Sequence, residues 1–355
     1  MSLKEFYHGK KILITGHTGF KGAWMCCVLQ VFGADVTGYA LEVPTEPALF
    51  SLAGLKNRIK SVEGDIRDLR HLENEFRKVQ PEIVIHMAAQ PLVRESYERP
   101  VYTYETNVMG TVHILECMRQ IPCVKSFVNV TTDKVYKNKE WVWGYREDEE
   151  LNGYDPYSNS KSCSELVTDS YRNSFFQDGR IPISTVRAGN VIGGGDFAVD
   201  RIIPDCIRAA TEKTDIFVRN PYSRRPYQHV LEPISAYLLL AKEQFEDTRK
   251  AGCYNVGPEE NDCYTTGMLT ELFCKKWNDC FHTDIKWKSG SVQGPHEANY
   301  LKLDCSKIKE QLKWYPKWDI ETAMDKIIQW NQSYMAGEKV AECMKSQIYE
   351  YFDLW

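Results

Sequence analysis

Three glycines spaced three residues apart constrain the fold of this chain more than any other feature. The segment "KKILITGHTGFKGAWMCCVLQVFG" places Gly16, Gly19 and Gly22 directly after an apolar strand and at the start of a helical pattern. In dinucleotide-binding βαβ units the glycines allow a tight turn, a close backbone approach to a pyrophosphate, and close packing of the helix on the strand. The free N–H groups of the helix N-terminus favour phosphates. The segment therefore predicts a dinucleotide site rather than a merely flexible turn.

The same alternation of strand and helix continues through the first 190 residues. Apolar strands are expected at "KILITG", "DVTGYAL", "RIKSVEGD", "EIVIHMA", "SFVNVTT" and "ISTVRAGNVIG", and helices over 20–32, 68–79, 100–119 and 157–176. Strands that alternate with helices indicate a parallel sheet covered on both faces, which explains their nearly continuous apolar runs. The pattern predicts an α/β fold with a Rossmann-type doubly wound parallel sheet.

After residue 190 the alternation loosens, and loops such as "RNPYSRRPYQ" appear. Further helices are expected over 232–246 and near 265–277, 305–312 and 320–334. We expect an NAD-binding domain of 1–190 plus about 228–257, and a smaller mixed α/β substrate lobe of about 191–227 plus 258–355. Two alternatives stay open for 336–355, a docked helix and a partly mobile tail.

Composition argues against several classes of protein. A net charge of −5 over 355 residues gives no basic stripe for nucleic acid. The start "MSLKEFYHGKK" has no signal-peptide core, and the strand after it is too short to span a membrane, so we expect a cytoplasmic protein. The 12 cysteines include no C-x-x-C pair, and with the 8 histidines they show no ligand spacing. Reduced thiols and no metal site are expected.

A candidate acid–base group lies further along the chain. Tyr157 and Lys161, in "YDPYSNSKSCSE", are four apart and share one face of a helix. A phenol titrates near pH 10, and a nearby ammonium and an oxidised nicotinamide both favour the phenolate, so Tyr157 is predicted to be a general base. The Y-x-x-x-K pattern alone arises often by chance. It gains weight here because an earlier apolar strand, "FVNVTTDKVY", ends in two hydroxyls, an acid and a lysine.

Several motifs together resemble a known family. "TGHTGFKG", "GDIRD", "HMAAQPLV", "NVMGT", "TTDKVY", "YSNSK" and "RAGNVIGGGD" resemble the extended short-chain dehydrogenase/reductases. Runs such as "MAAQPLVR", "EWVWGYRE" and "RNPYSRRPYQHVLEP" resemble the nucleotide-sugar 4,6-dehydratases that act on CDP-D-glucose, over roughly residues 8–331. The resemblance implies bound NAD+ that is regenerated each turnover, a role in deoxysugar synthesis for a surface glycan, and a homodimer formed through the helices near 100–119 and 157–176.

The resemblance also implies a mechanism. Tyr157 takes the proton of the sugar C4 hydroxyl while hydride passes to NAD+, water leaves from C5 and C6, and hydride returns to C6. Thr132 orients the C4 hydroxyl, Asp133 is the acid towards the C6 hydroxyl, and Lys134 is the base at C5. Many related dehydratases have Asp-Glu where this chain has Asp-Lys. A lysine base must lose its proton, and its ammonium opposes protonation of the aspartate, so the division of roles stays open. The alternative is a surface ion pair.

The implied cofactor contacts come from the glycine loop and the ends of the strands. They are Gly16, His17, Thr18, Gly19, Phe20, Gly22, Asp65, Ile66, Ala88, Ala89, Gln90, Thr131, Tyr157 and Lys161. Asp65 would meet the adenine, unless it caps the next helix in competition with Asp68. The acid expected for the ribose of NAD is missing at the end of the second strand, so the residues alone leave NAD and NADP open.

The implied substrate contacts are mostly arginines and second-lobe residues. They are Gln90, Arg94, Asn190, Arg201, Arg219, Arg225, His296, Glu297 and Tyr300. Guanidinium groups suit a diphosphate, although solvated charge is the plain alternative. Competing functions are a nucleotide-sugar 4-epimerase, a dehydratase for another nucleotide hexose, a dehydrogenase that releases NADH, and a non-catalytic NAD-sensing regulatory protein. An epimerase needs Tyr157 and Lys161 but not Asp133 and Lys134.

Overall fold

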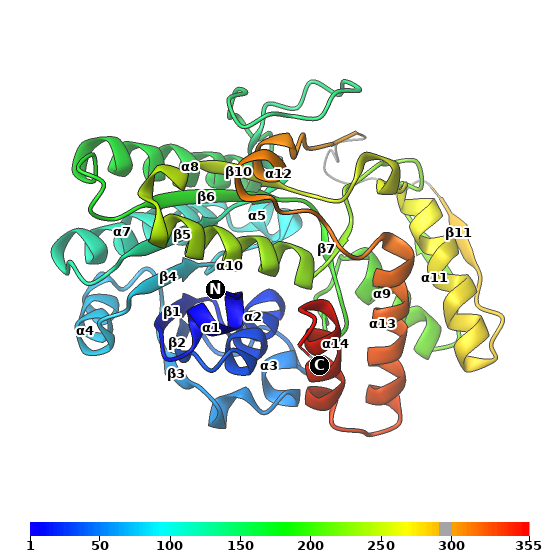
Figure 1. The fold of residues 1–355 in the computed structure, drawn as a ribbon. Helices are drawn as coiled ribbons and strands as arrows, with labels where there is room; N and C mark the ends of the chain where they lie inside the picture. Colours follow the sequence, from blue (N-terminus) through cyan, green and yellow to red (C-terminus); the bar gives the residue numbers. More distant parts are fainter. Residues whose placement is uncertain (291–299, 355) are drawn as a thin grey trace.

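A parallel seven-stranded sheet forms the centre of the computed structural model, which describes residues 1–290 and 300–354 (Figure 1). The strands are β1 (Lys11–Thr15), β2 (Asp35–Ala40), β3 (Lys60–Glu63), β4 (Ile83–His86), β5 (Ser126–Val130), β6 (Ile183–Ala188) and β10 (Cys253–Val256), in the order β10–β6–β5–β4–β1–β2–β3. The strand order reverses between β1 and β4, which is where doubly wound sheets bind ligands. The predicted Rossmann-type α/β fold is confirmed.

Helices cover both faces of this sheet. They are α2 (Phe20–Val31) and α10 (Leu231–Glu246) on one face, and α4 (Leu69–Val79), α7 (Gly110–Gln120) and α8 (Pro156–Phe175) on the other. Successive residues of β1 alternate between the two layers: Ile12 and Ile14 pack towards α2, and Leu13 packs towards α4 and α7. Burial on both faces explains why these strands are apolar throughout.

Some elements differ from those expected. The sheet has a seventh strand, β10, whose four residues were too few to stand out from the loops around them. The helix expected over 100–119 is interrupted: α6 (Pro100–Tyr104) runs into a π-helical turn, Glu105–Met109, before α7 begins. Short helices that the sequence did not predict are α1 (Leu3–Tyr7), α3 (Leu49–Leu52), α5 (Val93–Glu98) and α9 (Ile202–Thr211).

A smaller lobe packs beside the carboxyl ends of the strands (Figure 1). Its helices α9, α11 (Thr266–Phe281) and α13 (Ile320–Met335) enclose an apolar core of their own with the parallel pair β8 (Ile216–Val218) and β11 (Trp287–Ser289). A second parallel pair, β7 (Val191–Ile192) and β9 (Gln228–His229), lies where the chain passes between the two parts. The lobe is therefore mixed α/β, as predicted.

The C-terminal segment is a docked helix. After α12 (Ser306–Leu312) and α13, helix α14 (Val340–Tyr351) packs against α2 and α13, and its Met344 and Ile348 are buried. Tyr351 Oη donates a hydrogen bond to Glu232 Oε2 at 2.7 Å. Of the two alternatives for this segment, the docked helix is the one observed. None of the helices in the described ranges is long and apolar enough to cross a membrane.

Candidate active site

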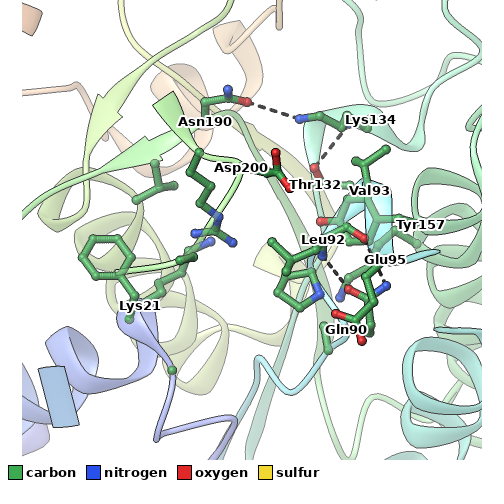
Figure 2. A pocket seen from close by; sticks show the side chains of 18 of the residues that line it. Lys21, Gln90, Leu92, Val93, Glu95, Thr132, Lys134, Tyr157, Asn190 and Asp200 are labelled. Atoms are coloured by element: carbon green, nitrogen blue, oxygen red, sulfur yellow. Dashed lines mark hydrogen bonds between the residues drawn. The ribbon is translucent and has the colours of Figure 1, made fainter. Parts of the chain in front are cut away.

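A cavity of about 1600 Å³ opens at the carboxyl ends of the strands. Its walls come from the glycine loop, the ends of β4, β5 and β6, the start of α8 and the near side of the lobe. Figure 2 shows Lys21 facing Thr132 and Tyr157 across this cavity, with Lys134 and Asn190 at one end of it. Most of the predicted catalytic and cofactor residues therefore meet in one place.

A different spatial constraint explains each of the three glycines of the loop. Gly16 has φ +78°, and a Cβ there would lie 2.8 Å from the backbone nitrogen of Ala88. A Cβ on Gly22 would lie 2.2 Å from the carbonyl oxygen of Gly16. A Cβ on Gly19 would meet only that same oxygen, at an ordinary 3.5 Å. The protein itself thus requires glycine at the first and third positions, and close approach of a ligand explains the second.

Gly19 is also the N-cap of α2, and no side chain caps this helix. The first N–H groups of a 12-residue helix are therefore available at the cavity wall. A free helix N-terminus beside a glycine that leaves room for a ligand suits the diphosphate of a dinucleotide. The residues present fit the predicted cofactor.

Most other predicted cofactor residues also line the cavity. They are Thr18, Phe20, Asp65, Ile66, Ala88, Ala89, Gln90 and Thr131. Asp65 is not the helix cap, because Asp68 accepts the hydrogen bond from His71 N at 3.0 Å and begins α4. Asp65 instead pairs with Arg67 at 2.7 Å. His17 is buried behind the loop, where its Nε2 lies 2.7 Å from Ser61 Oγ, so its side chain supports the loop and does not face the cavity.

The catalytic corner, which we define as Thr132, Asp133, Lys134, Tyr157 and Lys161, forms where β5 meets α8. Helix α8 begins at Pro156, after Asp155 caps it. Lys161 Nζ donates a hydrogen bond to Val130 O at 3.2 Å, which ties the second turn of α8 to the end of β5. Thr132 and Tyr157 both line the cavity, and the Thr132 hydroxyl acts to lower the pKa of the Tyr157 phenol. The Y-x-x-x-K pair and the strand end are thus brought together as predicted.

Burial dominates the titration of this pair in the protein alone. It raises the pKa of Tyr157 to about 12, against the lowering effect of the Thr132 hydrogen bond. It lowers the pKa of Lys161 to about 8, against the attraction of Glu165. In the protein alone, removal of the phenolate from water outweighs the lowering effect of the nearby Arg201 on the pKa of Tyr157. The combined effect of an ammonium and an oxidised nicotinamide stays a prediction for the NAD-loaded protein.

Asp133 and Lys134 form a contact that is not a surface ion pair. Asp133 is 0% exposed, and its Oδ1 lies 3.0 Å from Lys134 Nζ. Thr132 Oγ1 donates to the same oxygen at 2.9 Å, while Oδ2 has no hydrogen-bond partner among the described residues. Lys134 Nζ also donates to Asn190 Oδ1 at 3.2 Å (Figure 2). Asp133 does not itself line the cavity, so it connects to the cavity through its two neighbours.

A second buried group holds the corner in place. Glu165, one helical turn after Lys161, accepts hydrogen bonds from Thr131 Oγ1 at 2.5 Å, Thr185 Oγ1 at 2.6 Å and Arg187 at 2.9 Å. Arg187 also donates to Tyr136 Oη at 2.9 Å. Arg187 thus supports the fold around the corner.

The predicted arginines of the substrate site line the cavity. Arg201 pairs with Asp196 at 3.1 Å. Asp200 lies between two others: it is 3.0 Å from Arg219 of the lobe and 3.6 Å from Arg94 of α5. We call Arg94, Arg201 and Arg219 the arginine rim. Arg225 is deeper, 8% exposed, and also lines the cavity.

Three predicted substrate residues are not placed at the cavity. His296 and Glu297 lie outside the described residues. Tyr300 is described and does not line the cavity: its backbone pairs with Arg224, and its N donates to Glu140 Oε2 at 3.0 Å. Gln90 lines the cavity, but its amide is held by Leu92 O and by Thr103 Oγ1 at 2.9 Å.

Lys21 is a cavity residue to which the sequence analysis gave no role. Its Nζ lies 3.4 Å from Tyr237 Oη, and no described carboxylate forms an ion pair with it. Burial, followed by repulsion from Arg201 and Lys161, lowers its pKa to about 7. The available signal was a lysine inside the glycine motif, in "GFKG", directly beside the expected ligand site.

Known proteins match this chain along most of its length. A sequence model of the family described as "GDP-mannose 4,6 dehydratase" matches residues 13–327. The CDP-glucose 4,6-dehydratase of Salmonella typhimurium is 48% identical over 98% of both chains. The dTDP-glucose 4,6-dehydratase of Xanthomonas campestris is 26% identical and covers 92% of this chain and 95% of that one.

Solved structures of nucleotide-sugar epimerases and dehydratases have the same fold as this chain. The UDP-glucose 4-epimerase of Thermotoga maritima with UDP-glucose superposes with a TM-score of 0.79 at 21% identity, covering 91% of this chain and 99% of that one. The dTDP-glucose 4,6-dehydratase of Bacillus anthracis in complex with NAD gives 0.75 at 21% identity, covering 94% and 100%. With the sequence matches and the glycine loop and catalytic corner described above, the chain belongs to the GDP-mannose 4,6 dehydratase family.

Proposed function

We propose that this chain is an NAD-dependent dehydratase that converts CDP-D-glucose to CDP-4-keto-6-deoxy-D-glucose and water. The observation that carries the proposal is the contact of the buried Asp133 with Lys134, beside Tyr157. A 4-epimerase has no use for an acid and a base at this place, whereas removal of water across C5 and C6 needs both. The 48% identity to the Salmonella CDP-glucose 4,6-dehydratase supports the choice of sugar nucleotide.

The first step takes place at the sugar C4 hydroxyl. NAD bound at the glycine loop supplies the hydride acceptor at C4 and the hydride donor at C6. Thr132 holds the C4 hydroxyl beside Tyr157, and Tyr157 takes its proton. Because the pKa of Tyr157 is about 12 in the protein alone, with burial as the largest cause, the loaded enzyme needs further positive charge beside the phenolate to stabilise it.

The second step uses Asp133 and Lys134 as one unit. Lys134 Nζ and Asp133 Oδ1 lie 3.0 Å apart, close enough to exchange a proton directly. One proton transfer within the contact gives a carboxylic acid and a free amine. Lys134 then takes the C5 proton while Asp133 gives its proton to the departing C6 hydroxyl. The pair is an ion pair again after the elimination.

Proton NMR of the purified protein with CDP-, dTDP-, GDP- and UDP-hexoses and catalytic NAD+ tests this proposal. A new C6 methyl doublet from CDP-glucose, without net NADH, is the expected result. Conversion to a C4 epimer would make the protein an epimerase. Stoichiometric NADH would make it a dehydrogenase, and no turnover on any sugar would favour a regulatory protein.

Two glycine variants test the cofactor site. Gly19→Ala should leave the fold intact, because its Cβ has room, and weaken NAD binding by roughly tenfold or more, about 1.4 kcal/mol. Gly22→Ala is the contrasting variant, since its Cβ would overlap Gly16 O and destabilise the fold itself. Fluorescence titration with NADH and thermal melts separate the two effects. Unchanged NADH affinity in Gly19→Ala would argue against the proposed site.

We also propose that two copies pair through α6, α7 and α8. Exposed apolar residues on this surface support the pairing: Val101 is 69% exposed, Leu166 is 56% and Met109 is 46%. Light scattering after size exclusion should give a dimer. Leu166→Glu should give a monomer, whereas Met335→Glu, which removes an exposed apolar side chain of α13, should not.

For the domain division we propose 1–190 plus about 228–257 for NAD and about 191–227 plus 258–355 for the sugar nucleotide. The separate apolar core of the lobe supports this division, with α14 reaching back to α2. We place the enzyme in the cytoplasm. Its 12 cysteines are all free thiols, which suits a reducing compartment.

A further inference from the structure

The side-chain nitrogen of Lys134 is held from two sides. Its Nζ donates to Asp133 Oδ1 at 3.0 Å, and it donates to Asn190 Oδ1 at 3.2 Å (Figure 2). Asp133 is the preceding residue, whereas Asn190 lies 56 residues further along the chain. A lysine side chain is long and flexible, so a contact with its own neighbour leaves its end free to swing. The contact with Asn190 fixes Nζ relative to a second segment of the protein.

Chemistry decides which end of the Asn190 amide meets the lysine. A protonated Nζ carries donors only, so it meets the amide oxygen. A free amine still has N–H groups, so the same contact persists after Lys134 has given a proton to Asp133. The attraction between ammonium and carboxylate ends with that transfer. The Asn190 contact therefore holds Nζ in both protonation states, and it adds no negative charge that would favour the ammonium.

The backbone around Asn190 is anchored where the chain leaves β6. Asn190 O accepts a hydrogen bond from Gln228 N at 3.0 Å, at the start of the β7–β9 pair. Gly189 N donates to Val256 O at 3.4 Å, and a Cβ on Gly189 would lie 2.5 Å from Pro226 Cγ. The chain next to Asn190 therefore has little room to move, so Asn190 can hold Lys134 in place instead of following it.

The position of Lys134 matters because it is the member of the pair that reaches the cavity. Lys134 and Asn190 both line the cavity, whereas Asp133 is 0% exposed and does not. In the proposed reaction Lys134 is therefore the one of the pair that can meet the C5 proton. A general base works within hydrogen-bond reach of the proton that it takes, and a displacement of about 1 Å can cost about 10²-fold in rate.

We propose that Asn190 is a positioning residue that holds Nζ of Lys134 at the C5 proton of the sugar during the loss of water. This role rests on the proposed dehydratase function and goes beyond the substrate contact expected for Asn190. The two roles differ in what they change. A substrate contact changes KM and leaves the steps of the bound sugar alone, whereas a positioning contact changes the rate of elimination after C4 has been oxidised.

Asn190→Leu in the NAD-loaded enzyme, at saturating CDP-glucose, tests this role. Leucine has nearly the size of asparagine and accepts no hydrogen bond. The first rise in absorbance at 340 nm, which reports C4 oxidation, should stay within about threefold of the wild type, while loss of water, measured by rapid quench, should slow by at least about tenfold. Bound NADH should therefore accumulate to a higher level than in the wild type. Asn152→Leu, at an exposed amide of the cavity wall, is the matched control and should change neither rate.

A double variant shows whether Asn190 acts through Lys134. Elimination should be as slow in the combination of Lys134→Met with Asn190→Leu as in Lys134→Met alone, because the group that Asn190 positions is gone. Losses that multiply in the double variant would overturn the proposal. An Asn190→Leu enzyme in which only KM has risen would also overturn it, and would leave Asn190 a substrate contact.

Two further measurements keep these outcomes distinct. Thermal melts show whether Leu disturbs the fold, and in that case Asn190→Ala, which also removes the acceptor, is compared in the same way. Failure of the dehydratase assignment is seen separately, as a wild type that makes no C6 methyl product from CDP-glucose.

Discussion

The catalytic corner and the arginine rim face the same cavity and are held in opposite ways. At the corner, Asp133 is 0% exposed, and Lys161 bonds to the backbone of β5. At the rim, Arg94, Arg201 and Arg219 have side chains that are 37%, 35% and 30% exposed, and their carboxylate contacts come from loop residues. The corner is fixed before any ligand arrives, whereas the rim is held by contacts that a ligand can replace.

The difference follows from the energies of buried and exposed charge. An exposed ion pair contributes about 0–1 kcal/mol, so a phosphate competes with it easily. A buried charge that loses its partner costs several kcal/mol, so the contacts of the corner persist. Chemistry requires fixed geometry to a fraction of an ångström, and binding tolerates exchange of partners. The two walls of the cavity are suited to these two tasks, and variants in each wall should behave differently.

Tyr157→Phe should give the largest effect on activity. Removal of the phenol oxygen removes the proton acceptor at C4, and turnover should fall by about 10²- to 10⁴-fold. The fold and NAD affinity should be retained, since the ring remains. Tyr222→Phe, at a side chain that is 86% exposed, is the matched control. Turnover of Tyr157→Phe within threefold of the wild type would remove Tyr157 from the mechanism.

Glu165→Gln should give the largest effect on stability. It leaves the guanidinium of Arg187, whose side chain is 3% exposed, without its carboxylate, and should lower the free energy of unfolding by about 3–5 kcal/mol. Urea denaturation measures the change. The control is Glu150→Gln, where the pair with Lys137 is 55% and 51% exposed and the expected loss is below about 1 kcal/mol. Similar losses in both variants would mean that burial does not distinguish the two regions.

Lys21→Met should stabilise the ligand-free protein, because it removes a cation that burial disfavours. The pKa of Lys21 is about 7 in the folded protein, against 10.5 for an ordinary lysine. Between these two pH values the unfolded chain therefore binds one more proton than the folded protein does. The destabilisation that results from burying charged Lys21 is at its full size below pH 7 and decreases as the pH rises towards 10.5. The gain in Tm from Met should therefore be larger at pH 6.5 than at pH 9.5. Lys78→Met, at a side chain that is 70% exposed, should show no such trend.

The same contrast explains what the sequence could and could not predict. Gly16 and Gly22 are required by backbone geometry, and the corner residues follow an apolar strand or share a helix face, so topology alone brings them together. The Asp133–Lys134 contact was anticipated, but the burial that governs Tyr157 was not, because burial depends on the lobe and on α10 as well as on the local motif. Lys21 was missed for a similar reason: its partner Tyr237 is 216 residues away. The carboxylates of the rim come from loops with no periodic pattern.

Asp200→Asn should give the smallest effect and tests the rim directly. Asp200 has φ +59°, a conformation that asparagine tolerates, so the loop should keep its shape. Loss of the carboxylate removes a competitor of the substrate phosphates for Arg94 and Arg219, and KM for CDP-glucose should fall by up to about fivefold, or about 1 kcal/mol, with kcat unchanged. The advantage should shrink in high salt, which screens both kinds of contact. Asp178→Asn, which removes a charge far from the cavity lining, is the control. An increase in KM would mean that Asp200 orders the arginines for the substrate, and the rim would then resemble the corner in being built before the ligand binds.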